Sequence, residues 1–274
     1  LRSSSSRALI GVLCGAALAA SHNEWAALTW SKLGDEGWTS NKGLLWKVVL
    51  PMISSPIAGF TLGVLILGAI YALIWGFSKA GGRMARMVRP RWVNAIFGKA
   101  QLVSAAYMGF AHGSNDAQKT MGIIALTIFG AQAAGTLDNL PAWAMFLHPD
   151  GSEKDIDSWI VVTCALVMAA GTAAGGWKII KTLGHKMVKL QPIDGFAAET
   201  ASATILVTAA HFGMPVSTTH SISTAIMGVG FGKNPRALRI TVIERILWAW
   251  VLTIPAAGGI AYGLLRLLEA LGWA

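Results

Sequence analysis

The sequence predicts an all-α membrane protein, and three observations carry this prediction. Hydrophobic residues make up 54% of the 274 residues and charged residues only 13%, about half of the ~25% that is usual in soluble domains. The apolar residues fall in uncharged runs, several of them close to the roughly 20 residues that a helix needs to cross a bilayer. No alternating strand pattern appears, and lipid tolerates only helices or closed barrels.

Composition also excludes several classes of protein. The net charge of +9 comes from 22 Lys and Arg against 13 Asp and Glu. Such a charge favours nucleic acid in a soluble protein, but here the positive residues lie between the apolar runs, so we expect no nucleic-acid partner. Cys14 and Cys164 both lie inside apolar runs, which indicates packing residues and not a disulfide or a metal pair.

The uncharged runs mark the candidate spans in chain order. Two of them, 158–177 and 246–265, each fit one membrane-spanning helix. The run 48–78 is longer, and Pro51 and Pro56 near its start predict a kink or a tilt. The full set is 8–23, 48–78, 100–115, 120–137, 158–177, 200–232 and 246–265.

The segments between these runs differ in charge, which predicts the orientation in the membrane. Residues 79–99, 178–191 and 233–239 are basic, whereas 138–157 is acidic. Positive loops stay in the cytoplasm. We therefore expect a multi-pass protein of the cell membrane with the three basic segments inside and 138–157 outside.

This orientation has a consequence for residues 200–232, which begin and end on the same side. Gly213 and Pro215 interrupt the run, and the polar sequence Ser217–His220 follows. Each arm is too short to cross a bilayer. The sequence therefore predicts a re-entrant helical hairpin with its tip at mid-membrane, where protein or water must surround the non-helical backbone.

A weak internal repeat accompanies the predicted hairpin. Ser4, Ser5, Ser6 and Arg7 precede a small apolar helix, much as Ser217–His220 do. The loops that follow the two copies differ in charge, which favours opposite topology, as in inverted-repeat transporters with broken helices around a midplane site. We divide a single transmembrane domain, 1–274, into the remainder of a first repeat (1–78), a basic loop (79–99) and a second inverted repeat (100–268). With Leu1 in place of an initiator Met and no visible signal peptide, we expect the chain to lack the N-terminus of its protein.

The strongest candidate site is the polar stretch Gly109–Gly122, which holds His112, Asn115, Asp116 and Lys119. Ionisable residues inside a membrane are costly and usually functional; the alternative is a loop at the membrane surface. We expect Gly113 and Ser114 to open the helix here, so that a new helix beginning near Asn115 directs its positive end at an anion. Lys119 either neutralises a bound anion or pairs with Asp116, and both interpretations stay open.

Two further groups are candidates. The hydroxyls of Ser217, Thr218 and Thr219 suit an anion that must be released, although one of them could serve only as a helix cap. His220 is a substrate contact, a proton carrier or a packed polar residue. Glu199 lies among small residues that suit close helix packing. It is either a cation or proton site or a buried partner for a basic side chain.

Four stretches resemble the inorganic phosphate transporter (PiT) family. GFAHGSNDAQKTMGI, GFAAETASATILV and GMPVSTTHSISTAIMGVG are similar to its C-terminal repeat, and LRSSSSRALIGVLCGA to the end of its N-terminal repeat. The resemblance implies a phosphate symporter, not an enzyme, with no cofactor and with Na⁺ or H⁺ as the coupling ion. It implies inorganic phosphate and the lipid bilayer as partners, with a homodimer left open as an assembly state. The implied phosphate site comprises Ser217, Thr218, Thr219, Asn115, Asp116, Thr120, Ser4, Ser5 and Ser6, and the implied coupling site Asp116, Asn115, Glu199 and His112.

The sequence departs from the family pattern at two positions. Arg7 stands where a His is usual, and Lys119 stands where a second Asn is common. These departures leave the coupling ion open, and a sulfate permease remains the alternative within the same class. Phosphate can donate a hydrogen bond to a carboxylate and sulfate cannot, so a carboxylate beside the anion favours phosphate. Two hypotheses come from other classes of protein: a passive channel, and an intramembrane hydrolase that uses Ser217, His220 and Asp116. Against the hydrolase, the hydroxyl run lacks the glycine-flanked nucleophile elbow that such an enzyme would carry.

Overall fold

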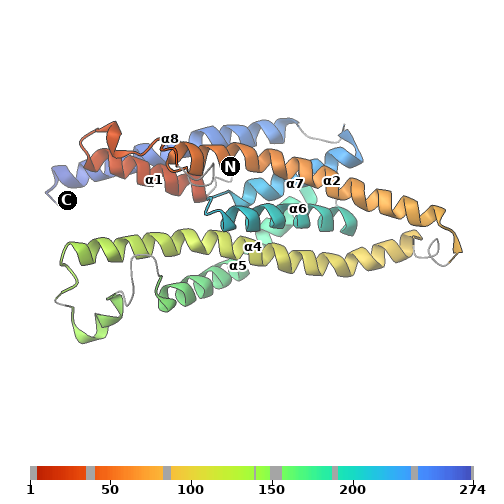
Figure 1. Cartoon of the computed structure of the whole chain (residues 1–274), viewed down its shortest axis with the longest axis horizontal. Coiled ribbons are helices and arrows are strands. Elements are labelled where there is room, and N and C mark those ends of the chain that lie inside the picture. The colour runs from red at the N-terminus through yellow and green to blue at the C-terminus, as the bar shows by residue number, and fades with distance from the viewer. Residues whose placement is uncertain are drawn as a thin grey trace.

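The computed structural model describes residues 5–34, 41–82, 88–138, 140–148, 156–186, 191–235 and 240–272, and this part of the chain is helical apart from its connections. Ser4 lies outside it. The helices are long rods laid side by side (Figure 1). They are α1 (Ser5–Ala20), α2 (Leu50–Lys79), α4 (Pro90–Ala133), α5 (Ser158–Lys186), α6 (Pro192–His211), α7 (Thr218–Lys233) and α8 (Ile240–Ala270), with short turns η1 (Trp25–Ala27), η3 (Leu45–Val49) and η4 (Ala142–Leu147).

Three helical segments of the described chain are long and apolar enough to cross a membrane: Leu45–Lys79, Ser158–Gly175 and Val251–Ala270. They overlap the spans predicted from the uncharged runs 48–78, 158–177 and 246–265. Large apolar side chains on them stay exposed, such as Leu166 at 65% and Ile260 at 72%. Apolar outer faces of this extent suit contact with lipid.

The prediction that the helix opens at Gly113 and Ser114 is wrong. Helix α4 runs without a break from Pro90 to Ala133 and carries the whole polar stretch on its middle turns. A glycine inside a helix costs only about 1 kcal/mol relative to alanine, and Asp116 and Lys119, three residues apart, form an ion pair along the helix that supports it. The polar stretch therefore lies along the side of one continuous helix and not at the end of a broken helix.

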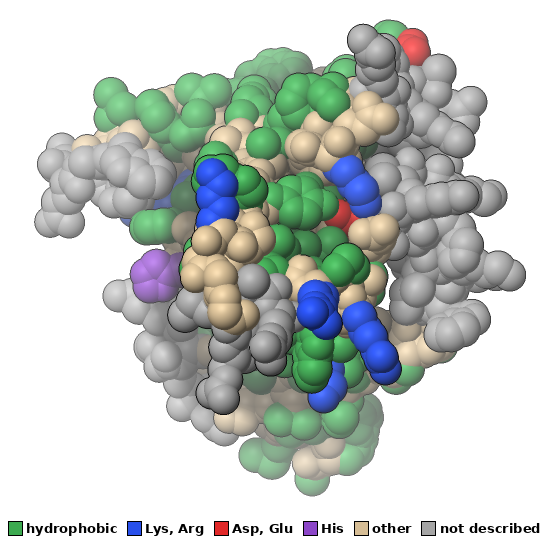
Figure 2. Space-filling model, turned by 90° about the vertical axis from the view of Figure 1, so that its right-hand side faces the viewer, with side chains coloured by type: hydrophobic (Ala, Val, Ile, Leu, Met, Phe, Trp, Pro, Cys, Tyr) green, Lys and Arg blue, Asp and Glu red, His purple; other side chains and the backbone are tan. Residues whose placement is uncertain are grey.

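The basic segment 79–99 is also partly helical. Arg89 is extended, Pro90 occupies the first turn, and α4 begins there, because proline suits the start of a helix, where its missing N–H costs nothing. The C-terminus of α2 and the N-terminus of α4 lie at the same end of the molecule, opposite the acidic connection between α4 and α5 (Figure 1). Lys and Arg side chains gather on this end (Figure 2).

Helices α6 and α7 form a hairpin joined by Phe212–Ser217. Helix α6 begins earlier than the predicted arm, since Pro192 lies in its first turn and Gln191 and Asp194 form a reciprocal capping box that satisfies free N–H groups. At the tip, Gly213 adopts a φ of 61°, which favours glycine. At the open end, Lys233 Nζ donates to Asp194 Oδ2 over 2.8 Å.

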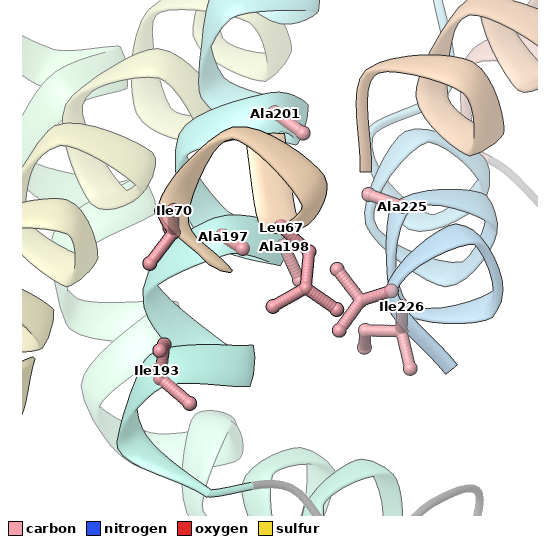
Figure 3. Close-up of a cluster of buried hydrophobic side chains, with 9 residues drawn as sticks. Leu67, Ile70, Ile193, Ala197, Ala198, Ala201, Ala225 and Ile226 are labelled. Carbon is pink, nitrogen blue, oxygen red and sulfur yellow. The ribbon is translucent and has the colours of Figure 1, made fainter. Parts of the chain in front are cut away.

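The core lies where the hairpin meets α2. Leu67 and Ile70 of α2 pack against alanines of α6 and against Ala225 and Ile226 of α7 (Figure 3). Small residues let the backbones approach: a Cβ at Gly63 of α2 would collide with the Ala225 backbone. Close packing of this kind replaces the hydrophobic drive that is absent between helices in lipid.

Helix α1 packs on α8 in the same manner. A Cβ at Gly15 would collide with the backbone of Gly258. Each short helix that follows a hydroxyl run therefore packs on a long helix of the other half: α1 on α8, and α7 on α2. Helices α1 and α7 both begin near the middle of the long axis and run toward opposite ends (Figure 1).

The ion pair at the open end of the hairpin should stabilise the fold more than an exposed one. The Asp194 side chain is 1% exposed, whereas Glu269, whose pair with Arg266 has the same 2.8 Å length, is 26% exposed. We expect Asp194→Asn to cost about 1–3 kcal/mol, because it weakens both the pair and the capping box. Glu269→Gln should cost at most about 1 kcal/mol. Thermal unfolding of the two purified variants in detergent would measure the difference; equal melting temperatures would contradict it.

Candidate functional site

Three segments that are distant in sequence meet at the hairpin tip. The backbone carbonyl of Val216 accepts a hydrogen bond from Ser6 Oγ at 3.2 Å and another from Lys119 Nζ at 3.2 Å. Ser6 lies in the first turn of α1, Lys119 lies in the middle of α4, and Val216 lies two residues before α7. The first hydroxyl run, the polar stretch of α4 and the second hydroxyl run thus converge.

Asp116 is the centre of this cluster. Its Oδ1 accepts a 2.7 Å hydrogen bond from Lys119 Nζ, its Oδ2 accepts one from Thr218 Oγ1 at 3.4 Å, and His112 Nδ1 lies 3.5 Å from Oδ2. The side chains of Lys119 and Asp116 are only 11% and 14% exposed. The sequence leaves two interpretations of Lys119 open. In the structure, the ammonium group of Lys119 pairs with the carboxylate of Asp116.

The start of α7 faces the same place. Ser217 Oγ accepts the backbone N–H of His220 at 3.3 Å, so Ser217 is the helix cap. The Ser217 and Thr218 side chains are buried, and Thr219 is half-buried. The remaining N–H groups of the first turn and the positive end of the helix dipole favour an anion beside them.

The described contacts do not arrange Ser217, His220 and Asp116 as a triad. Ser217 accepts the His220 backbone N–H, and the histidine beside Asp116 is His112. A nucleophilic serine needs a base aligned on its hydroxyl. The Ser217 hydroxyl oxygen instead accepts the hydrogen bond of the helix cap.

Two buried polar side chains extend the cluster. Asn115 is 3% exposed, and within the described chain its Oδ1 has no hydrogen-bond partner. Leaving such an acceptor unpaired is costly unless a ligand fills it. Arg7, also 3% exposed, follows Ser6 in α1 and donates from Nη2 to the Met52 carbonyl at 3.4 Å.

Other predicted site residues lie elsewhere. Glu199 accepts a hydrogen bond from Ser104 Oγ, at the contact between α6 and α4. Ser104 precedes Asp116 by twelve residues, which is about 18 Å along a helix. Thr120 faces a groove of about 490 Å³ between α4 and α5, and Ser5 is exposed. The structure therefore separates Glu199 from the cluster at the hairpin tip, whereas Thr120 directly follows Lys119 on α4.

Two features of the site were not predicted from the sequence. The Val216 carbonyl joins the three segments, and a backbone group between Pro215 and Ser217 gives no sequence signal. Ser104 and Gln101, which both bond Glu199, do give one: they are polar residues three apart in an otherwise apolar run, and so share a helix face.

Comparison with known proteins is consistent with this geometry. The model of the phosphate transporter family matches residues 1–261. The chain is 38% identical over 269 residues to a probable low-affinity inorganic phosphate transporter of Bacillus subtilis, covering 97% of this chain and 68% of that protein. It is 39% identical to a protein of the same description from Rhizobium meliloti, covering 93% of this chain and 64% of that protein. The chain thus spans about two thirds of the length of these relatives.

A solved structure, described as the sodium-dependent phosphate transporter, is similar in fold. It superposes with a TM-score of 0.65 over 97% of this chain and 74% of that one. The two sequences are 20% identical, so this similarity concerns the arrangement of the helices alone.

Proposed function

The chain belongs to the phosphate transporter family, and we propose that it is the core of a symporter that moves inorganic phosphate across the membrane together with Na⁺ or H⁺. The observation that carries this proposal is the convergence of Ser6, Asp116 and Thr218 around the Val216 carbonyl. Hydroxyls and helix N–H groups donate to phosphate oxygens. Donors without net charge hold an anion that must also leave.

The carboxylate in the cluster favours phosphate over sulfate. Asp116 Oδ2 lies beside the Thr218 hydroxyl at the start of α7. A protonated phosphate oxygen can donate to such a carboxylate, whereas sulfate, which is fully ionised, can only accept. A bound sulfate would leave its oxygens facing the Asp116 carboxylate, and unpaired buried acceptors are penalised.

The packing supports alternating access between two inverted repeats. Helices α1 and α7 run from the middle of the molecule toward opposite ends (Figure 1), and each packs on the long helix that follows the other. In this proposal α6 and α7 enter the membrane from the basic end and turn back at Gly213, so that the site lies at the midplane. Because α1 packs on α8 and α7 packs on α2, we propose that one repeat rocks against the other.

The arrangement of charge supports the proposed orientation. The basic ends of α2 and α4 lie together, opposite the acidic connection between α4 and α5 (Figure 1). Positive segments stay on the cytoplasmic side. We therefore propose that the face in Figure 2 is cytoplasmic in a multi-pass protein of the cell membrane.

Uptake of radiolabelled phosphate into proteoliposomes tests the proposal. The complete protein should accumulate phosphate when a Na⁺ or pH gradient is imposed, and excess unlabelled phosphate should block this uptake while sulfate does not. Equal block by sulfate would move the assignment to a sulfate permease. Equilibration without any gradient dependence would indicate a channel.

Removing one hydroxyl of the cluster should weaken phosphate binding. We expect Thr218→Ala to raise the KM for phosphate by about tenfold, which corresponds to one hydrogen bond to a charged ligand. Thr204→Ala is the matched control, since Thr204 Oγ1 bonds only the Thr200 carbonyl of its own helix within the described contacts and lies exposed. Initial rates across a range of phosphate concentrations would separate KM from the maximal rate. An unchanged KM in Thr218→Ala would contradict the assignment.

A further inference from the structure

We propose that the ammonium group of Lys119 occupies the cation position of this site permanently, so that phosphate uptake proceeds without Na⁺ and is driven by protons. This inference rests on the proposed phosphate transport and names its coupling ion. It comes from the surroundings of one atom, Lys119 Nζ.

The groups around Lys119 Nζ are those that bind a hard cation. Asp116 Oδ1 lies 2.7 Å from it and the Val216 carbonyl oxygen 3.2 Å. Carboxylate and backbone carbonyl oxygens are the ligands that proteins offer to such ions. Here both oxygens accept hydrogen bonds from a side chain that cannot dissociate.

The position links two elements that a bound cation would also link. Asp116 lies on α4, and Val216 lies at the tip of the α6–α7 hairpin. Lys119 therefore bridges the rod and the hairpin, and it stays buried with 11% of its side chain exposed. A mobile ion that bridged the same two oxygens would have to enter and leave in every transport cycle.

Charge balance argues against a second cation beside Lys119. Asp116 supplies one negative charge, and Lys119 already neutralises it at contact distance. A Na⁺ ion on the same oxygens would face the ammonium group directly, and like charges at close range in a poorly hydrated site repel strongly. The cation that crosses with phosphate must therefore bind elsewhere or be a proton.

A candidate proton carrier lies beside the ion pair. His112 Nδ1 lies 3.5 Å from Asp116 Oδ2. An imidazole can gain and lose a proton without needing a coordination shell. Proton coupling thus needs no group beyond those the chain provides.

The variant Lys119→Asn tests this inference. Asparagine removes the charge and leaves an amide oxygen, so a Na⁺ ion can take the vacated place between Asp116 and Val216. The complete protein is reconstituted, and phosphate uptake under a pH gradient is compared in sodium and choline salts. Lys79→Asn is the matched control, because Lys79 lies over the Trp75 ring at the end of α2, far along the chain from the cluster.

We expect wild-type and Lys79→Asn uptake to be equal in the two salts. In Lys119→Asn, uptake in choline should fall by about tenfold or more, as expected for loss of a buried charge pair, and sodium should restore it. Wild-type uptake that requires Na⁺, or a Lys119→Asn variant that is indifferent to Na⁺, would overturn the inference.

A binding measurement separates this inference from the proposed function. Sodium should raise the melting temperature of detergent-solubilised Lys119→Asn, relative to choline, and leave the wild type unchanged, since a ligand stabilises only the state that binds it. If the wild type moves no phosphate, the proposed function fails, and the melting temperatures still decide on the cation site. Stabilisation of the wild type by Na⁺, or of neither protein, counts against the inference.

Discussion

Asp116→Asn should abolish phosphate uptake while the protein still inserts into the membrane. The carboxylate accepts hydrogen bonds from Lys119 and Thr218 and so joins α4 to the start of α7. Removing one partner of a buried charge pair costs about 3–5 kcal/mol, so we expect uptake to fall by at least ~100-fold. Radiolabelled phosphate uptake into proteoliposomes, normalised to inserted protein, would measure the loss.

The control for this change is Asp138→Asn. Asp138 is exposed in the turn after α4, where the loss of one charge should leave uptake within about twofold of the wild type. Equal uptake by Asp116→Asn and the wild type would contradict the proposed site. Failure of Asp116→Asn to insert would show instead that the pair is needed for folding, and detergent extraction with size-exclusion chromatography distinguishes that case.

Gly63→Ala and Gly228→Ala should destabilise the protein more than alanine at a glycine that faces open space. A Cβ at Gly63 would collide with the Ala225 backbone, and one at Gly228 with the Phe60 backbone. Backbone atoms cannot move aside as a flexible side chain can, so α2 and α7 must separate. Overpacking of this kind costs about 1–3 kcal/mol, and thermal unfolding in detergent would measure it for each variant.

Gly68→Ala is the matched control on the same helix. A Cβ there meets no atom of the described structure within 4 Å. Because alanine favours a helix over glycine by about 1 kcal/mol, Gly68→Ala should be neutral or slightly stabilising. If Gly63→Ala melts at the same temperature as Gly68→Ala, the close approach of α2 and α7 is wrong.

Much of the fold could be predicted from the sequence because membrane helices leave a strong signal. Uncharged runs of sufficient length predicted the three spanning segments. The hairpin followed from Gly213 and Pro215 together with the charge of its flanks. Boundaries were less predictable: Pro90 and Pro192 start their helices well before the uncharged runs do, since a helix can carry charged residues outside the apolar core.

The candidate site was predictable by residue type but not by arrangement. The prediction that Gly113 and Ser114 open the helix is wrong, because composition alone cannot weigh the small cost of a helical glycine against the continuity of a 44-residue helix. That Asp116 contacts Thr218 while Glu199 lies about 18 Å away along α4 depends on how α4 crosses the hairpin. Such crossings are set by packing of small residues over long sequence separations, which no local pattern encodes.

The measurement that tests the central claim most directly is a structure of the complete protein with phosphate bound, determined by electron cryomicroscopy. We predict tetrahedral density at the start of α7, within hydrogen-bonding distance of Thr218 and close to Asn115 and Ser6. Tetrahedral density beside Glu199 and Ser104 would contradict the claim that the three segments at the hairpin tip form the phosphate site. So would the absence of density at the start of α7 at phosphate concentrations that saturate uptake.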